Sequence, residues 1–345
     1  MTTNKPRHSG QRHGLDLRPL SVGRAVFDPP LLCAPMAGVT HSALRRLVAD
    51  FGGYGALYTE MLSPSAVCGE DLARSPFTKK RPHERKVVYQ LRLTDTHRLD
   101  RILQRVRDAR PYGVDINLGC PAPEIAKIGG GVALFQDMDR LREVIGGTRE
   151  RWPGLLSVKC RLGNEQNGWR EALGRRLRLF EELGVDMVAI HPRFTKDKLK
   201  RTARWTEVAR AAEETGLPLV VNGDIVDRAT LERCMEASHS RGYMLGRIVA
   251  VQPWIFAHLT GAAPEVDYAE VWDRLFGYVN EDFPPERAIG RIKEFTTYYA
   301  RNFFFGHELY RAVQSASDIR MLYDRAMVFL SSSPRLVRRP SVAGI

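Results

Sequence analysis

The sequence predicts a (β/α)8 barrel followed by a smaller all-helical domain. Between residues 30 and 260, short strand-like runs alternate with helix-like segments, and their short connections are typical of parallel βα units. Eight strand candidates in this arrangement favour a closed barrel over an open doubly wound sheet. Past residue 264 the pattern becomes helical and poor in strands. The 345 residues also exceed the size at which one core usually stops growing, so a second domain is expected.

The elements follow in order along the chain. The strand candidates are Leu31–Ala34, Leu57–Glu60, Val87–Leu91, Val114–Asn117, Leu156–Arg161, Met187–His191, Leu219–Asn222 and Tyr243–Leu245. The helices expected around them are Ser42–Asp50, Thr96–Arg110, Met138–Arg151, Arg170–Leu183, Thr206–Glu214 and Arg228–Ala237. The second domain is expected to contain the helices Tyr268–Asn280, Pro285–Phe304 and Ser315–Leu330. The domain prediction is a flexible basic arm over 1–20, the barrel over 21–262, the helical domain over 263–333 and a flexible tail over 334–345.

Composition limits the class of protein. Lys and Arg (52) outnumber Asp and Glu (40), and the resulting net charge of +12 indicates a polyanionic partner. The chain has no run of about 20 apolar residues and no apolar core near its start, so neither a membrane span nor a secretory signal is expected. The five cysteines never form a C-x-x-C pair, which argues against a disulfide framework or a metal centre and for a reducing cytoplasm.

Cys120 is the strongest candidate for chemistry. It follows the apolar run 113–118, which Gly119 and Pro121 break abruptly. This places a thiol on the turn beyond the carboxyl end of a strand, where parallel α/β enzymes build their active sites. A free thiol is mostly protonated at neutral pH, so it can donate a proton as well as attack. The alternative is a small buried residue in a tight turn.

The carboxyl ends of nearly all strand candidates carry polar or conformationally special residues. In order they are Pro35 and Met36, Glu60, Gln90, Asn117 with Cys120, Lys159 with Arg161, His191, Asn222 to Asp224, and Gly246 with Arg247. In a barrel these ends converge on one face, where side chains are functional. Each residue alone could make only a structural hydrogen bond or salt bridge, but their coincidence on one rim predicts a ligand. A lysine within a strand is costly to bury unless it meets an anion or a carbonyl.

The last two strands predict a phosphate site. Gly223 and Gly246 allow backbone N–H groups to approach phosphate oxygens, and Arg247 supplies a bidentate cation. Barrels commonly bind a phosphate at this position. Lys159 and His191 would then face the other end of the same ligand. A phosphate at one end and cationic donors at the other suit flavin mononucleotide (FMN).

Taken together, these residues resemble the tRNA-dihydrouridine synthases. The shared motifs, in the order of that family, are Ala34–Thr40, Thr59–Met61, Asp115–Pro121, Val158–Gly163, Asn222–Ile225 and Leu245–Arg247. The resemblance covers residues 30–260 well and the helical tail more loosely. It implies an FMN-bearing barrel that reduces the C5–C6 bond of uridine in tRNA, with NADPH or NADH as the electron source. It also implies that the helical domain helps to hold the RNA.

The resemblance implies roles for individual residues as well. Cys120 is the implied proton donor to C5 of uracil, after hydride transfer to C6. The implied FMN contacts are Pro35, Met36, Gln90, Lys159, His191, Asn222, Gly223, Asp224, Gly246 and Arg247. The implied uridine or RNA contacts are Glu60, Asn117, Arg161 and Arg193. His41 and Pro192 depart from the family pattern, which usually has Asp and Gly there, and Pro192 removes a backbone donor just before Arg193.

Two basic runs lie in loops on the predicted active face. The run Arg193–Arg201 carries five cations against one acid, and Lys79–Arg81 carries three. Lys198, Lys200 and Arg201 are therefore predicted to contact RNA phosphates. The alternative for each run is an ordinary solvated loop.

Other functions stay open at this point. An FMN barrel oxidoreductase of the dihydroorotate or ene-reductase type shares the fold and cofactor, but needs neither the charge of +12 nor the extra domain. A non-catalytic RNA-binding protein would not need the set of Cys120, Lys159 and His191. Gly129–Gly131 is a turn beneath the substrate or simply a loop, and with Val132–Leu134 it favours the subgroup acting at position 16 of tRNA. The modified uridine and an rRNA target stay open, and a monomer without metal is expected.

Overall fold

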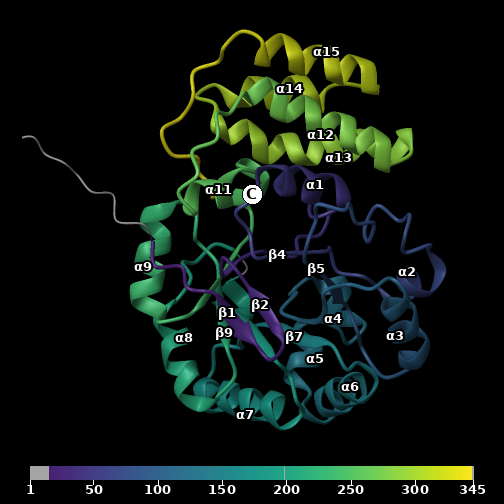
Figure 1. Cartoon of the computed structure of the whole chain (residues 1–345), viewed down its shortest axis with the longest axis vertical. Helices are drawn as coiled ribbons and strands as arrows, with labels where there is room; N and C mark the ends of the chain where they lie inside the picture. The colour runs from purple at the N-terminus through teal and green to yellow at the C-terminus, as the bar shows by residue number, and fades with distance from the viewer. Residues whose placement is uncertain (1–14, 198, 344–345) are drawn as a thin grey trace, which may run out of the picture.

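The expected closed barrel is present in the computed structural model, which describes residues 15–197 and 199–343. Its eight strands are β3 (Leu31–Cys33), β4 (Ala56–Tyr58), β5 (Val87–Leu91), β6 (Gly113–Leu118), β7 (Leu155–Gly163), β8 (Met187–Phe194), β9 (Leu219–Asn222) and β10 (Gly242–Leu245). Neighbouring strands are parallel, and the barrel closes where β10 pairs with β3, with Tyr243 opposite Leu31. The (β/α)8 prediction is therefore confirmed, and the carboxyl strand ends share one rim (Figure 1).

Helices connect the strands and cover the outside of the barrel. They are α1 (Ser42–Phe51), α2 (Pro64–Gly69), α3 (Leu99–Asp108), α4 (Pro123–Lys127), α5 (Val132–Gln136), α6 (Met138–Arg151), α7 (Trp169–Glu182), α8 (Thr206–Ala211), α9 (Arg228–Ser238), α10 (Ile248–Val251) and α11 (Ile255–Leu259). The 3-10 turns η1 (Thr195–Asp197) and η2 (Ala212–Glu214) follow β8 and α8. Asp227 starts α9 with a capping box, in which its carboxylate accepts the Thr230 backbone N–H at 2.8 Å.

His41, one of the two departures from the family pattern, has a structural role. Its Nδ1 accepts the backbone N–H of Leu44 at 3.4 Å and so caps α1. Burial lowers the pKa of His41 to about 3, so the ring is neutral and its nitrogen can accept this bond. The ring also packs edge-on against Phe283 of the helical domain, with centroids 5.0 Å apart.

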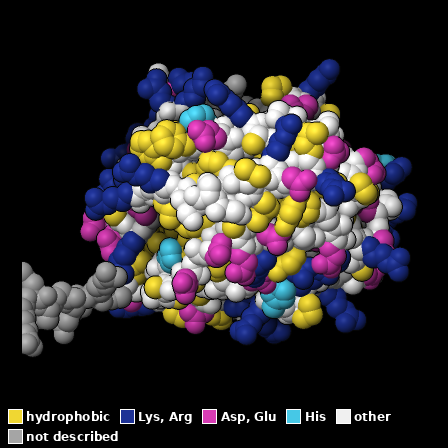
Figure 2. All heavy atoms as spheres, turned by 90° about the horizontal axis from the view of Figure 1, so that it is seen from above, with side chains coloured by type: hydrophobic (Ala, Val, Ile, Leu, Met, Phe, Trp, Pro, Cys, Tyr) yellow, Lys and Arg dark blue, Asp and Glu magenta, His cyan; other side chains and the backbone are white. Residues whose placement is uncertain are grey.

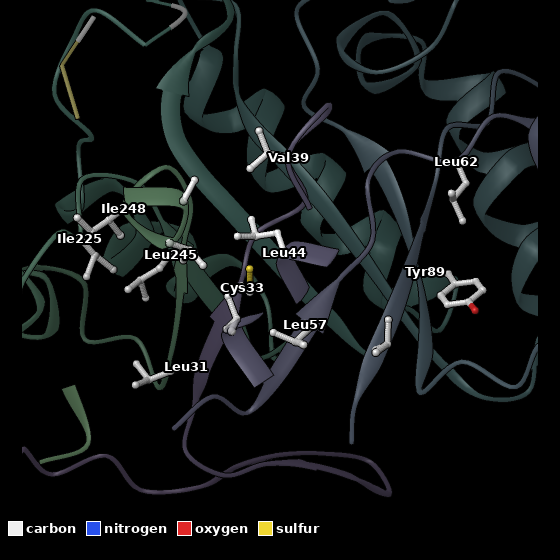
Figure 3. Packing of buried hydrophobic residues seen from close by; sticks show 14 of the residues in the cluster. Leu31, Cys33, Val39, Leu44, Leu57, Leu62, Tyr89, Ile225, Leu245 and Ile248 are labelled. Atoms are coloured by element: carbon white, nitrogen blue, oxygen red, sulfur yellow. The ribbon is translucent and has the colours of Figure 1, made fainter. Parts of the chain in front are cut away.

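The strands separate two hydrophobic cores. In β3, Leu31 and Cys33 face the outer helices, whereas Leu32 faces the barrel interior, as the two-residue period of a strand requires. Figure 3 shows part of the outer core, including Leu31, Cys33 and Leu57. The inner core is completed by a hairpin that the sequence analysis did not anticipate, β1 (Leu20–Val22) and β2 (Ala25–Phe27). Its residues pack at the amino ends of the strands, which leaves the opposite rim for a ligand.

The helical domain packs against one side of the barrel, next to α1 and α11 (Figure 1). It contains α12 (Tyr268–Asp282), α13 (Pro285–Tyr299), the 3-10 turn η3 (Ala300–Asn302), α14 (Gly306–Gln314) and α15 (Ile319–Leu330). The helix expected over 285–304 thus ends at residue 299, and the sequence analysis missed α14.

Ion pairs join α12 to the barrel. Asp282 of α12 accepts Lys79 at 2.6 Å and Arg81 at 2.8 Å, and Glu281 accepts Arg46 at 2.5 Å. The Asp282 side chain is fully buried, so these bonds are shielded from water. Two of the three cations in the run 79–81 therefore hold the domains together.

The C-terminal segment 335–342 returns from α15 to the barrel rim. It begins beside η3, where the Val337 N–H donates to the Asn302 carbonyl at 2.8 Å. Arg339 then pairs with Asp227 at 2.6 Å, and Arg247 donates to the Val342 carbonyl at 2.6 Å. The sequence analysis expected a flexible tail here. The domain boundaries otherwise stay predictions, and residues 1–14 of the expected arm lie outside the described residues.

No helix in the described part of the chain is long and apolar enough to cross a membrane. Within the same residues, no three His, Cys, Asp or Glu side chains are grouped so that they could hold a metal ion.

Candidate active site

The carboxyl ends of β7 to β10 surround one cavity of about 170 Å³. The expected cofactor residues in its wall are Pro35, Met36, Lys159, His191, Asn222, Gly223, Asp224, Gly246 and Arg247. Val342 of the C-terminal segment also contributes to the wall. Cofactor pockets usually enclose about 300–1,000 Å³, so Val342 occupies part of the space that a nucleotide would need.

Cationic side chains crowd this cavity. Burial, and then the neighbouring Arg161, lower the pKa of Lys159 to about 8. Burial lowers the pKa of Arg161 to about 10, with Arg193 contributing. His191 has a pKa well below its usual value, because burial and these cations all disfavour the imidazolium. The ring of His191 is therefore neutral at pH 7, and the site as a whole favours an anionic ligand.

Arg193 lies among the cofactor-side residues. Only 2% of it is exposed, and its guanidinium bonds both carboxylate oxygens of Asp224, at 2.7 and 2.8 Å. Its Nη1 donates to Nε2 of the neutral His191 ring at 2.6 Å. Gly223 fits against this pair with φ of +111°, and a Cβ there would lie 2.8 Å from the His191 ring. The sequence analysis assigned Arg193 to RNA, but its position supports the cofactor side.

A buried polar network lies beneath the other half of the rim. Gln90 donates to Asp115 at 2.7 Å and accepts from Asn117 at 2.9 Å, and Ser157 donates to the other Asp115 oxygen at 2.6 Å. Burial raises the pKa of Asp115 to about 6, although the Ser157 and Gln90 hydrogen bonds oppose this shift. Asp115 is not among the functional residues predicted from the sequence, although an acidic residue inside a buried strand is a recognisable signal. Gln90 does not line this cavity and bonds Asn117, and its predicted contact with the cofactor stays a prediction.

Asn117 in turn shapes the turn that carries Cys120. Its Oδ1 accepts the backbone N–H groups of Gly119 at 3.3 Å and Cys120 at 3.1 Å. The Val132 N–H donates to the Cys120 carbonyl at 3.1 Å. At Gly131, with φ of +57°, a Cβ would lie 2.5 Å from that carbonyl oxygen. The glycine turn thus packs directly against Cys120, whose partial exposure differs from that of a sealed core thiol.

Two further predicted contacts, Arg161 and Glu60, lie at the ends of other strands. Arg161 is 5% exposed and donates through Nε to the Gly119 carbonyl at 3.0 Å, which links β7 to the Cys120 turn. Glu60 accepts the Gly38 N–H at 2.7 Å through one oxygen, whereas its other oxygen is buried with no hydrogen-bond partner among the described residues. Burial raises the pKa of Glu60. An unsatisfied buried carboxylate oxygen is costly, so Glu60 is a candidate for a ligand contact.

The predicted RNA contacts after β8 differ in position. Lys200 and Arg201 are exposed, beside Leu199 in the cavity wall. Lys198 lies outside the described residues. Lys196 pairs with Glu165 at 2.6 Å. The two exposed cations are therefore adjacent to the cavity, where a bound polyanion could reach them.

Solved structures that resemble this chain contain the same kind of barrel. Morphinone reductase in complex with tetrahydroNAD has a TM-score of 0.52 at 10% identity, and the match covers 73% of this chain and 92% of that one. Histamine dehydrogenase from Rhizobium sp. 4-9 also has a TM-score of 0.52, at 12% identity, over 69% of this chain and 46% of that one. At these identities the likeness concerns the fold alone.

Sequence comparisons are more specific. The chain is 31% identical over 252 residues to a probable tRNA-dihydrouridine synthase of Rhodobacter capsulatus, which covers 70% of this chain and 74% of the relative. It is 26% identical to a tRNA-dihydrouridine(16) synthase of Ralstonia nicotianae, over 84% of this chain and 92% of the relative. The profile described as dihydrouridine synthase matches residues 32–301, and by this match the chain belongs to the dihydrouridine synthase family.

Proposed function

We propose that this protein reduces the C5–C6 bond of a uridine in tRNA to dihydrouridine, with FMN as its resident cofactor and NADPH or NADH as the electron source. The observation that carries the proposal is the Cys120 turn. A partly exposed thiol, on a turn whose backbone is held by Asn117 and Arg161, shares the barrel rim with a cluster of cations. Acting as a monomer in the cytoplasm, the enzyme would meet tRNA there.

The residues around the cavity fit FMN. Gly223 leaves room that any side chain would fill, and Arg247 lies in the same wall as a cation for the phosphate. Lys159 and His191 would face the flavin ring, and the positive potential of this wall suits its reduced, anionic form. Arg247 currently bonds the Val342 carbonyl, so phosphate binding would replace that contact. When bound, the flavin supplies the hydride that C6 of uracil receives.

The chain's own residues would handle the proton. Addition of hydride at C6 leaves negative charge on C5 and O4, and Cys120 would donate its proton to C5. Asn117 and Arg161 would hold the turn so that the thiol faces the base rather than the interior. Because the target base must leave its stack to reach this turn, exposed cations beside the cavity would hold the flanking phosphates.

Reduction of tRNA by the purified protein tests this function. We would load the protein with FMN, add NADPH and tRNA that lacks dihydrouridine, and measure dihydrouridine by mass spectrometry of the nucleosides. We expect dihydrouridine in tRNA, and no reduction of free uridine or orotate. Reduction of a free pyrimidine with no reaction on tRNA would instead favour the small-molecule barrel oxidoreductase.

The same reaction identifies the modified position. Relatives named tRNA-dihydrouridine(16) synthase match 82–84% of the chain, which includes part of the helical domain. We therefore expect sequencing of the product to place dihydrouridine at position 16. Modification at another position would leave the chemistry intact and correct this assignment, and ribosomal RNA serves as a parallel substrate in the same assay.

A further inference from the structure

A groove on the helical domain lies next to the C-terminal segment. It has a volume of about 580 Å³ and is formed on one side by η3 and α14 and on the other by residues 337–341. The groove is lined by Thr297, Ala300, Arg301, Phe303, Phe304, Gly306, His307, Tyr310, Val337, Arg339 and Ser341. Arg301 and Arg339 line it, Arg339 being paired with Asp227 at 2.6 Å, and no acidic side chain lines the groove among the described residues. Its charge therefore suits an anionic partner. Figure 2 shows the surface seen from above, on the side of the helical domain, where hydrophobic side chains are spread over the face and Lys and Arg side chains are densest towards its edges, with acidic side chains among them.

Exposed aromatic rings gather at this groove. Phe304 is 56% exposed, Phe305 53% and Tyr310 41%, whereas the adjacent Phe303 is buried in the domain core. The Phe304 and Phe305 rings stand edge to face with centroids 5.0 Å apart, and the Arg335 guanidinium lies 5.0 Å from the Phe304 centroid. Large rings exposed together are unusual on a protein surface that binds nothing. Rings interleaved with arginines are the combination that stacks nucleobases and holds phosphates.

The base of the groove is firmly held. The Asn302 amide donates to the Val251 carbonyl of α10 at 2.6 Å, and the Phe304 N–H donates to the Arg335 carbonyl at 2.8 Å. Phe303 packs edge-on against Phe329 of α15, with centroids 5.4 Å apart. These contacts hold the backbone that carries the exposed rings, so binding a base there would cost little backbone entropy.

The groove also connects to the candidate active site. Its outer wall begins at Val337, and the same segment reaches the cavity at Val342. Five residue steps span at most about 17 Å of extended chain. A single strand of RNA whose target base enters the barrel could therefore place a nucleotide a few positions away in the groove.

We propose that this groove binds an unpaired nucleotide of the RNA substrate, with its base stacked on Phe304 and its phosphate held by Arg301. The proposal rests on the proposed function, because it takes tRNA as the substrate. It adds a second, non-catalytic binding site outside the barrel. This site would increase the affinity for the RNA and fix the position of the strand, without taking part in the reaction.

Binding of tRNA to the FMN-loaded full-length protein, measured by fluorescence anisotropy over a range of salt concentrations, tests the proposal. Phe304→Leu keeps an apolar side chain but removes the ring, so we expect binding about fivefold to a hundredfold weaker with an unchanged salt slope. Arg301→Gln should flatten the slope of log affinity against log salt by about 0.7–0.9. In the reduction assay both variants should raise KM and leave kcat unchanged, because they remove binding that is uniform along the reaction.

Matched variants separate this role from a structural one. Phe304→Tyr retains the aromatic face and should bind tRNA as the wild type does. Val328→Ala changes another exposed apolar side chain, and Arg320→Gln another exposed arginine, both on α15 away from the groove. Neither should alter the affinity or the slope.

The outcomes are distinguishable. If Phe304→Leu and Arg301→Gln both bound and reduced tRNA as the wild type does, the groove proposal would be overturned. The proposed function would stay intact. In that case a protein partner becomes the better occupant. If the wild-type protein neither bound nor reduced tRNA, the proposed function itself would fail.

Discussion

The barrel rim and the groove of the helical domain both concentrate positive charge, but they hold it differently. On the rim, Arg161 and Arg193 are 5% and 2% exposed and are fixed by hydrogen bonds. In the groove, the cations and rings face solvent. Buried charges shift the pKa values of their neighbours, and the size of each shift depends on atomic positions. Exposed charges attract a polyanion through screened interactions that are roughly additive. The rim is thus suited to chemistry and the groove to holding a polyanion.

A single added side chain in the rim should have the largest effect. Gly223→Val would place Cβ 2.8 Å from the His191 ring at a φ of +111°. We expect the affinity for FMN to fall at least about a hundredfold, because the clash and the backbone strain both distort the cavity wall against which FMN would bind. Flavin absorbance per chain after gel filtration measures this decrease.

Gly261→Val is the matched control for that variant. It introduces the same side chain at a φ of +90° with nothing within 4 Å, so it reproduces the backbone strain without the clash. FMN retained by Gly223→Val would show that the cofactor does not occupy this wall.

The charge of Lys159 should make stability depend on pH. Burial lowers the pKa of Lys159 to about 8 in the folded protein, against 10.5 in the unfolded chain. Below pH 8 both states are protonated and the folded state carries the full cost of burying the charge. Between pH 8 and 10.5 the folded state releases its proton first, so stability rises with pH, by about 3 kcal/mol in total.

The difference between two unfolding curves isolates this effect. We would measure the free energy of unfolding of the cofactor-free protein and of Lys159→Met between pH 7 and 11. The advantage of Lys159→Met should shrink as the pH rises through 8. Other titrating groups affect both proteins equally. A difference in unfolding free energy that stays constant across this range would therefore contradict the burial of the Lys159 charge.

Neutralising the exposed cations beside the cavity should have the smallest effect. Lys200→Gln with Arg201→Gln should weaken tRNA binding modestly and lower the salt slope by about 0.7–0.9 for each phosphate that the protein no longer neutralises. The double variant Arg101→Gln and Arg175→Gln, which changes two exposed arginines on the outer helices α3 and α7, should bind normally. An equal decrease in affinity for both pairs would show that only net charge matters.

Most of the barrel could be predicted from the sequence because each strand is a short apolar run between helical segments. The hairpin β1–β2 was missed because its strands are not continuous apolar runs: each has an exposed middle residue, whereas the equally short β3 and β4 are buried throughout. Helix α14 was missed because the aromatic run 303–305 extends the apolar pattern of α13, although Phe303 is buried and the next two rings turn outward. That division depends on packing against α15 and the C-terminal segment.

The positions of the rim residues could be predicted, but their partners could not. Knowing where β7 and β8 end is enough to place Lys159 and His191 on the cavity. Nothing local indicates that Arg193 turns inward to Asp224, a contact between residues 31 positions apart. In the same way, the basic run that contains Lys79 and Arg81 predicts RNA binding. The sequence does not indicate that Asp282 of a distant helix accepts both side chains.

The role of Cys120 is the central claim, and separating the two half-reactions tests it most directly. The FMN-loaded wild type and Cys120→Ala would each be reduced with NADPH and then mixed with tRNA, while flavin absorbance is followed in a single turnover. We predict equal rates of flavin reduction, and reoxidation by tRNA that is about a hundredfold or more slower in Cys120→Ala. Equal reoxidation rates in the two proteins would contradict proton donation by this thiol.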